Sequence, residues 1–119
     1  MLVVEDNPRN LKLMKNILNK LGCESFSASN GKEAVKQAKR NKYDICFMDI
    51  RMPEMDGFEA TRKIHNTIDK KLPIIALSAD ARKQEQDKAK EVGMIEYLTK
   101  PITMKKLKDA IVKWKRKRL

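Results

Sequence analysis

The chain has 119 residues, of which 41% are hydrophobic and 36% are charged, and its formal net charge is +11 at pH 7. This length and hydrophobic content suit a single folded domain with one core. The sequence contains no run of about 18 apolar residues and no N-terminal pattern typical of a secretory signal. We therefore expect a cytoplasmic domain that makes no contact with a membrane.

The positive charge raises the question of an anionic partner, because a strongly basic surface is one signature of nucleic-acid binding. Aromatic residues make up only 5% of the chain, which leaves few side chains to stack on bases. Much of the charge falls in the run 113–118, at the end of the sequence, where a linker could begin. We therefore expect a basic surface and no nucleic-acid partner.

The first part of the chain predicts a strand, a helix and a second strand. Residues 1–4 form an apolar run that indicates a buried strand, and the chain starts on it with no lead-in, as in a domain cut from a longer protein. Pro8 suits the first turn of a helix, which continues with apolar residues at helical spacing. Residues 23–28 predict a weaker strand. Asn30, with Glu33 three positions later, signals the start of a second helix.

The central part of the chain holds the most regular apolar run. Residues 44–48 predict a strand of the kind that is buried on both faces in a parallel sheet, and Asp49 follows it at once. Asp56 and Glu59 then repeat the capping pattern and predict the start of a third helix.

The last part of the chain continues the alternation of strands and helices. Residues 73–77 predict a buried strand, 81–92 a polar helix and 95–98 a short strand. Thr103 is a capping residue for a final helix. Five strands thus alternate with five helices. This pattern favours an α/β domain whose parallel sheet is covered on both faces.

Polar side chains stand at or just beyond the ends of four predicted strands. The carboxyl ends of parallel strands meet at one edge of the sheet, which is where open α/β sheets place their chemistry. All these side chains can therefore lie together. They are Glu5 and Asp6 after the first strand, Asp49 after the third, Ser78 after the fourth and Lys100 near the fifth.

This set of side chains indicates a metal ion and a phosphoryl group. Three carboxylates held together repel one another unless a cation lies among them. Oxygen ligands without His or Cys favour a hard divalent cation such as Mg²⁺. A tetrahedral oxyanion would satisfy the hydroxyl and the ammonium group. Together these features predict phosphoryl chemistry with a carboxylate, Asp49, as the nucleophile.

Four motifs connect these residues to a known family. They are V-V-E-D-N at 3–7, F-M-D-I-R-M-P-E-M-D-G at 47–57, A-L-S-A at 76–79 and G-M-I-E-Y-L-T-K-P at 93–101. With them the chain resembles the receiver domain of two-component response regulators over essentially its whole length, as one domain at 1–119. The resemblance implies the flavodoxin-like (CheY-like) doubly wound fold, with strand order 2-1-3-4-5.

The resemblance also implies the reaction and the metal ligands. Asp49 would accept a phosphoryl group from a phosphohistidine on a histidine kinase or a histidine phosphotransfer protein. Asp6, Asp49 and the main-chain carbonyl of Arg51 would bind Mg²⁺ directly, and Glu5 would act through water. The side chains of Arg51 and Asp80 would border the site and tune the lifetime of the phosphorylated state.

The remaining roles implied by the family concern the transferred group and the response to it. Ser78 and Lys100 would hold the phosphoryl oxygens. Tyr97 would be the switch aromatic, turning inward when Ser78 moves towards the phosphate. Pro101 follows Lys100 at a position where the family commonly has a cis peptide bond. Such a domain catalyses its own phosphorylation and dephosphorylation and is not expected to be a stand-alone enzyme.

Several readings of the function stay open from the sequence. The motifs are most like those of receivers in hybrid sensor histidine kinases, although a free-standing regulator is the other context. A different class of function is a binding module that keeps the receiver fold and uses its basic face on nucleic acid or another anion. A phosphatase with an aspartate nucleophile is disfavoured, because its general-acid Asp would stand two residues beyond the nucleophile, where this chain has Arg51.

Overall fold

The computed structural model describes residues 1–116, so Lys117 and Arg118 of the basic run lie outside the described residues. The strands are β1 (Leu2–Val4), β2 (Phe26–Ala28), β3 (Cys46–Asp49), β4 (Ile74–Ser78) and β5 (Glu96–Thr99). The helices are α1 (Pro8–Lys20), α2 (Gly31–Arg40), α3 (Gly57–Thr67), α4 (Lys83–Val92) and α5 (Met104–Trp114). All strand pairs are parallel and the order is β2-β1-β3-β4-β5, which confirms the predicted fold.

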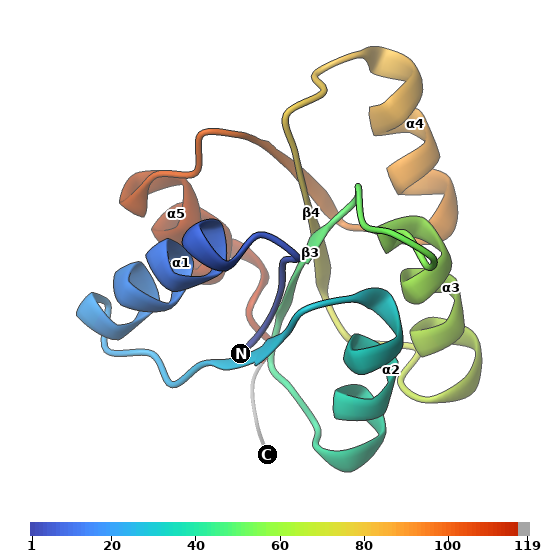
Figure 1. Ribbon diagram of the computed structural model, residues 1–119, viewed down its shortest axis with the longest axis horizontal. Helices are drawn as coiled ribbons and strands as arrows, with labels where there is room; N and C mark the ends of the chain where they lie inside the picture. The colour runs from blue at the N-terminus through green and yellow to red at the C-terminus, as the bar shows by residue number, and fades with distance from the viewer. Residues whose placement is uncertain (117–119) are drawn as a thin grey trace.

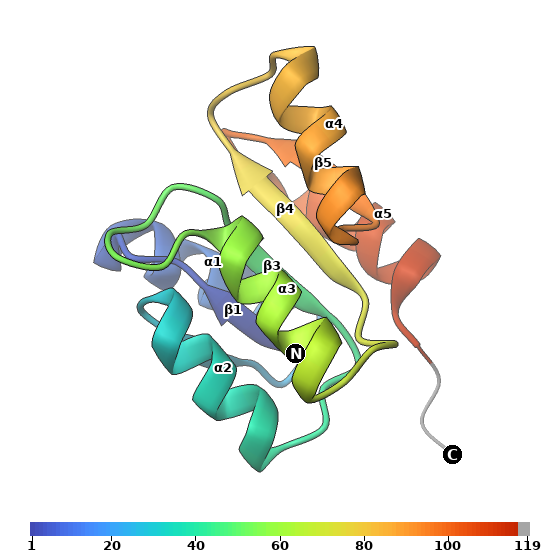
Figure 2. The ribbon, with the colours of Figure 1, turned by 90° about the vertical axis from the view of Figure 1, so that its right-hand side faces the viewer.

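The sheet lies between two layers of helices. Helices α1 and α5 lie together on one face, and α2, α3 and α4 cover the other (Figure 1), as the rotated view in Figure 2 also shows. Phe47 of β3 belongs to the core under α1 and α5, whereas its neighbour Met48 belongs to the core under the other three helices. Strand β3 is therefore buried on both faces, and its last residue, Asp49, has a fixed place at the sheet edge.

Side-chain caps explain where most of the helices begin. Asn7 caps α1, and Pro8 occupies the first helical position, where a missing N–H costs nothing. Asn30, Asp56 and Thr103 cap α2, α3 and α5 as predicted. Each accepts a hydrogen bond from the main-chain nitrogen three positions later, at 2.8, 2.9 and 3.2 Å respectively. Within residues 1–116, no helix has the length and apolar character needed to cross a membrane.

The second strand is shorter than predicted. The prediction placed it at 23–28, but β2 begins only at Phe26. The main-chain nitrogen of Cys23 donates to the carbonyl of Leu18 at 2.9 Å, so this segment belongs to the turn that ends α1. Pairing with β1 begins where Phe26 donates to the carbonyl of Met1 at 2.8 Å.

Helix α4 begins two residues later than predicted. The prediction started it at Ala81, whereas the first helical residue is Lys83. The side chain of Asp80 accepts a hydrogen bond from the main-chain nitrogen of Arg82 at 2.9 Å. This local turn competes with helix formation over these residues and connects β4 to α4.

Candidate phosphoacceptor site

The structure brings the predicted site residues together at the carboxyl edge of the sheet. Glu5, Asp6 and Asp49 each offer a carboxylate oxygen within 4.8 Å of the others. The Nζ atom of Lys100 lies 3.3 Å from Oε2 of Glu5 and 3.6 Å from Oδ1 of Asp49. Ser78 ends the neighbouring strand, opposite Thr99 of β5. The predicted convergence of these strand ends is therefore confirmed for the acids and the lysine.

Asp49 is a carboxylate that the fold holds almost out of contact with solvent. It is the last residue of β3 and only 3% exposed, and its Oδ1 accepts a hydrogen bond from the main-chain nitrogen of Arg51 at 3.3 Å. Burial first, and then repulsion from Glu5, raise the pKa of Asp49 to about 7, although Lys100 opposes this shift. Lys100 alone therefore does not offset the burial and repulsion of these acids, and an added cation would favour the charged form of Asp49.

Gly57 lets α3 begin directly against this strand end. A Cβ atom at this position would lie 2.4 Å from the carbonyl oxygen of Asp49, which is closer than a Cβ atom and a non-bonded oxygen can approach. The main-chain nitrogen of Gly57 donates to the carbonyl of Ile50 at 2.9 Å. The D-G pair at 56–57 therefore has two functions: Asp56 caps the helix, and the glycine allows the loop after β3 to pack closely behind the acceptor.

The three acids fit a hard divalent cation. Glu5 is almost fully buried, and its Oε1 accepts hydrogen bonds from the main-chain nitrogen of Asn7 at 3.3 Å and from the amide of Asn10 at 3.4 Å. Asp6 is exposed and open to solvent. All donor atoms are oxygens, and one member of the set faces water. Mg²⁺ prefers such a set, because it usually keeps several water ligands.

Lys100 directly follows β5 and is held there by its main chain. Its main-chain nitrogen donates to the carbonyl of Ser78 at 2.8 Å, which fixes the end of β5 against β4. The peptide bond between Lys100 and Pro101 is cis, as the family resemblance implied. The side chain then reaches across the sheet edge to Glu5 and Asp49. Among the cationic side chains of residues 1–116, this ammonium group is the only one within 4 Å of the Asp49 carboxylate.

Ser78 and Tyr97 both contact the turn at Asp80. The Ser78 hydroxyl is buried and accepts a hydrogen bond from the main-chain nitrogen of Asp80 at 3.0 Å. The half-buried Tyr97 donates its hydroxyl proton to the main-chain carbonyl of Asp80. The two residues predicted to form the switch are therefore linked through one residue of the β4–α4 connection.

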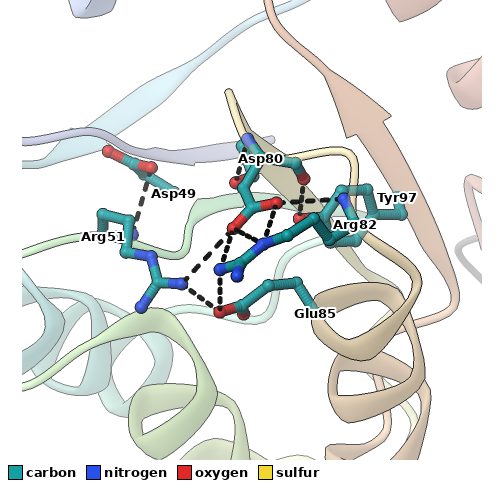
Figure 3. Close-up of polar contacts among 7 residues, drawn as sticks. Asp49, Arg51, Asp80, Arg82, Glu85 and Tyr97 are labelled. Carbon is teal, nitrogen blue, oxygen red and sulfur yellow. Dashed lines mark hydrogen bonds and ion pairs between the residues drawn. The ribbon is translucent and has the colours of Figure 1, made fainter.

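The structure adds one feature that sequence reasoning missed, a cluster of charged side chains beside the site (Figure 3). The guanidinium of Arg51 pairs with Glu85 of α4, and its Nη2 lies 3.8 Å from Oδ2 of Asp80. Arg82 forms a bidentate pair with Asp80, with a closest distance of 2.8 Å. No pattern in the sequence singles out Glu85, which stands among many charged residues in a polar helix.

Comparison with known proteins then decides the family. A sequence model described as the response regulator receiver domain matches residues 1–112. The chain belongs to this family. Hybrid signal transduction histidine kinase G of Dictyostelium discoideum is 45% identical over 114 residues, which cover 92% of this chain and 3% of that protein. Sensor protein GacS of Pseudomonas syringae pv. syringae is 38% identical over 95% of this receiver and 13% of the relative.

Solved receiver domains have the same fold. One, from a sensor histidine kinase of Pseudomonas aeruginosa with a magnesium ion in its active-site cleft, is 37% identical with a TM-score of 0.88, covering 95% of this chain and 93% of that one. The receiver domain of Ssk1 from Saccharomyces cerevisiae, solved with the phosphotransfer protein Ypd1, is 30% identical with a TM-score of 0.89. That match covers 96% of this receiver and 86% of the solved chain.

Proposed function

We propose that this receiver accepts a phosphoryl group on Asp49 from a phosphohistidine of a histidine kinase or a histidine phosphotransfer protein. The observation that carries the proposal is the buried Asp49 carboxylate, which lies beside two further acids and within 3.6 Å of the Lys100 ammonium. A carboxylate placed in this way is a poor structural residue, because its charge is largely desolvated. It is well placed as a nucleophile whose charge is balanced when a cation and a phosphoryl group are bound.

The proposed reaction moves one phosphoryl group between two side chains. A carboxylate oxygen of Asp49 forms a bond to phosphorus as the nitrogen–phosphorus bond of the phosphohistidine breaks, and the imidazole leaves with the bonding electron pair. The product is an acyl phosphate on Asp49. Lys100 and the hydroxyl of Ser78 bind the phosphoryl oxygens, where negative charge is concentrated. Hydrolysis by water returns the carboxylate and inorganic phosphate.

The metal site proposed for Mg²⁺ consists of three ligands from this chain. These are the carboxylates of Asp6 and Asp49 and the main-chain carbonyl of Arg51, with Glu5 acting through water. Bound there, the ion would supply positive charge that offsets the acids and the incoming phosphoryl oxygens. Support comes from the oxygen-only donor set, the proximity of the acids, and the burial and repulsion from Glu5 that together raise the pKa of Asp49.

The proposed response to phosphorylation runs through the turn at Asp80. A phosphoryl oxygen would attract the Ser78 hydroxyl, which now accepts a hydrogen bond from the main chain of Asp80. The Tyr97 hydroxyl is hydrogen-bonded to the main-chain carbonyl of Asp80, so movement of this turn would release the ring to turn inward. The conformational equilibrium would then shift towards a second state, whose surface a partner can distinguish from that of the first.

The wider context is also a proposal. The chain spans 3% and 13% of the lengths of the two curated relatives described above, and both are named as kinases or sensor proteins. We infer that the domain acts in a cytoplasmic phosphorelay, as the receiver of a hybrid histidine kinase, and that its donor is a phosphohistidine protein.

Incubation with acetyl phosphate and Mg²⁺, followed by intact mass measurement, tests the proposed acceptor. We expect addition of one phosphoryl group to the wild-type chain, none to Asp49→Asn, and normal addition to Asp87→Asn, which changes an exposed carboxylate of α4. Addition that survives in Asp49→Asn, or no addition to the wild-type chain, would contradict the proposed function.

A further inference from the structure

The side chain of Arg51 is directed away from Asp49, which stands two residues earlier in the sequence. Its main-chain nitrogen donates to Oδ1 of Asp49, but its guanidinium extends towards α4 (Figure 3). There it pairs with Oε1 of Glu85 and approaches Oδ2 of Asp80. The Arg51 side chain is 59% exposed, so it is free to rotate to other positions at the rim of the site.

Glu85 is the better buried partner of this ion pair. It lies in the first turn of α4, and its side chain is only 14% exposed. Its Oε2 atom is buried and has no hydrogen-bond partner among residues 1–116. Besides Arg51, the cation nearest to its other oxygen is Arg82, at 3.9 Å. A desolvated carboxylate with one unsatisfied oxygen depends strongly on its counter-ion, so Arg51 is held by a partner that would be destabilised without it.

A phosphoryl group on Asp49 would compete for the same guanidinium. It would add up to about two negative charges and three acceptor oxygens. The planar guanidinium is well suited to binding phosphoryl oxygens in a bidentate manner. Arg51 is anchored beside Asp49 by its own main chain, so only its side chain has to move.

We propose that Glu85 is a positioning residue that holds the Arg51 side chain away from Asp49. A phosphoryl group on Asp49 breaks this ion pair by binding the Arg51 guanidinium in place of Glu85. This inference rests on the proposed function and adds a regulatory partner to the same site. When the Arg51 side chain moves away, the Glu85 carboxylate in the first turn of α4 keeps only the more distant Arg82, at 3.9 Å, as a counter-ion. Phosphorylation would therefore change the ion pairing of α4 directly, in addition to the proposed movement of Ser78 and Tyr97.

The sign of the effect follows from linkage. When a phosphoryl group binds, part of its favourable interaction with Arg51 offsets the cost of breaking the pair between Arg51 and Glu85. Removing the charge of Glu85 therefore strengthens binding of a phosphoryl analogue, whereas removing the charge of Arg51 weakens it. A purely structural ion pair behaves differently, because either substitution destroys the same contact and both act in the same direction.

The test uses beryllofluoride, a tetrahedral analogue of the phosphoryl group, at fixed Mg²⁺, with backbone amide NMR as the readout of its dissociation constant. We expect Glu85→Gln to bind about two- to fivefold more tightly than wild type, as suits a partly exposed ion pair. Arg51→Met should bind more weakly. Adding Glu85→Gln to Arg51→Met should change nothing further. Glu91→Gln, at an exposed position of the same helix, is the matched control.

Three results would overturn the inference. These are unchanged affinity in Glu85→Gln, a shift of both single variants in the same direction, and an effect of Glu85→Gln that persists in the Arg51→Met background. Circular dichroism melting shows that each variant is folded at the temperature of the titration. If wild type binds beryllofluoride and takes one phosphoryl group from acetyl phosphate while Glu85→Gln equals wild type, the proposed function stands and only this inference fails.

Discussion

The Lys100 ammonium nitrogen lies 3.6 Å from Oδ1 of Asp49 and closer still, at 3.3 Å, to Oε2 of Glu5. One lysine therefore balances two buried carboxylates that repel each other. The same positive charge lies next to the proposed metal ligands. In the proposed reaction it would therefore help an incoming phosphoryl group and oppose the binding of a divalent cation.

Replacing Lys100 by Met separates these two effects. We expect phosphorylation by acetyl phosphate to slow by at least about tenfold, because a cation that binds the transferring group is lost. Mg²⁺ should bind about fivefold more tightly, because the acids lose their competing charge. Intact mass measured over time gives the first quantity, and titration with Mg²⁺ followed by amide NMR gives the second.

Lys105→Met, at an exposed position of α5, controls for the loss of one positive charge. It should leave both quantities unchanged. Weaker Mg²⁺ binding in Lys100→Met would show that the lysine supports the metal site by holding the acids in place and does not compete with the ion.

The convergence of the site residues could be predicted because it depends only on topology. Apolar runs such as 44–48 have the length and composition of strands buried on both faces, and the capping residues mark where the helices begin. Once the strands are parallel, residues at their carboxyl ends must meet at one edge. Asp6, Asp49 and Lys100 were therefore predictable as neighbours without knowledge of any distance.

The partner of Arg51 could not be predicted in the same way. Helix α4 contains many charged residues, and which of them faces the site depends on how the helix is rotated on the sheet. That rotation is decided by the burial of Ala89 and Val92, not by Glu85 itself. The predicted start of α4 is two residues too early for a different reason. The side chain of Asp80 forms a local hydrogen bond that competes with helix formation in an otherwise helical sequence.

The ion pair between Arg116 and Asp69 predicts a pH dependence of stability. Arg116, beyond the end of α5, binds Asp69 after α3 through both guanidinium Nη atoms, and its Nε donates to the carbonyl of Tyr43 at 2.9 Å. This guanidinium lowers the pKa of Asp69. A carboxyl group with a lowered pKa stabilises the folded state above its unfolded pKa, and this stabilisation is lost as the pH falls through the folded value.

We therefore expect Asp69→Asn to lower the free energy of unfolding by about 1 kcal/mol at pH 7. The difference from wild type should shrink as the pH falls below about 4, the usual pKa of an aspartate. Urea unfolding at a series of pH values measures this. Asp109→Asn, an exposed carboxylate on α5, should show no such convergence. A constant difference at all pH values would mean that Asp69 acts through packing and not through its charge.

The high net charge leads to a prediction about nucleic acid. We expect duplex DNA to bind weakly and only at low salt, because a basic surface without base contacts depends on counterion release. Fluorescence anisotropy of a labelled duplex between roughly 50 and 200 mM salt measures this dependence. Submicromolar affinity at about 150 mM salt, unchanged in Asp49→Asn, would favour an anion-binding module over the proposed receiver function.

The surface next to the acceptor site predicts where the phosphohistidine partner docks. A small, mainly apolar groove of about 90 Å³ lies between α1 and the segment after β5. Glu5 and Lys100, which line the groove, also contact each other at the proposed site. Leu13 lines the groove as well and is 51% exposed. A protein that delivers a phosphoryl group to Asp49 must lie over this edge of the sheet, and an apolar residue beside it is suited to anchor that contact.

We therefore expect Leu13→Asp to slow transfer from a phosphorylated histidine phosphotransfer protein by about tenfold, because an interface anchor is replaced by a charge. Phosphorylation by acetyl phosphate should be unaffected, since a small donor needs only the site itself. Val112→Asp, at a 78% exposed position of α5, is the matched control and should change neither rate. Radiolabel transfer followed by gel separation measures the first rate. If Leu13→Asp slows both donors equally, the substitution disturbs the site, and Leu13 is not a docking residue.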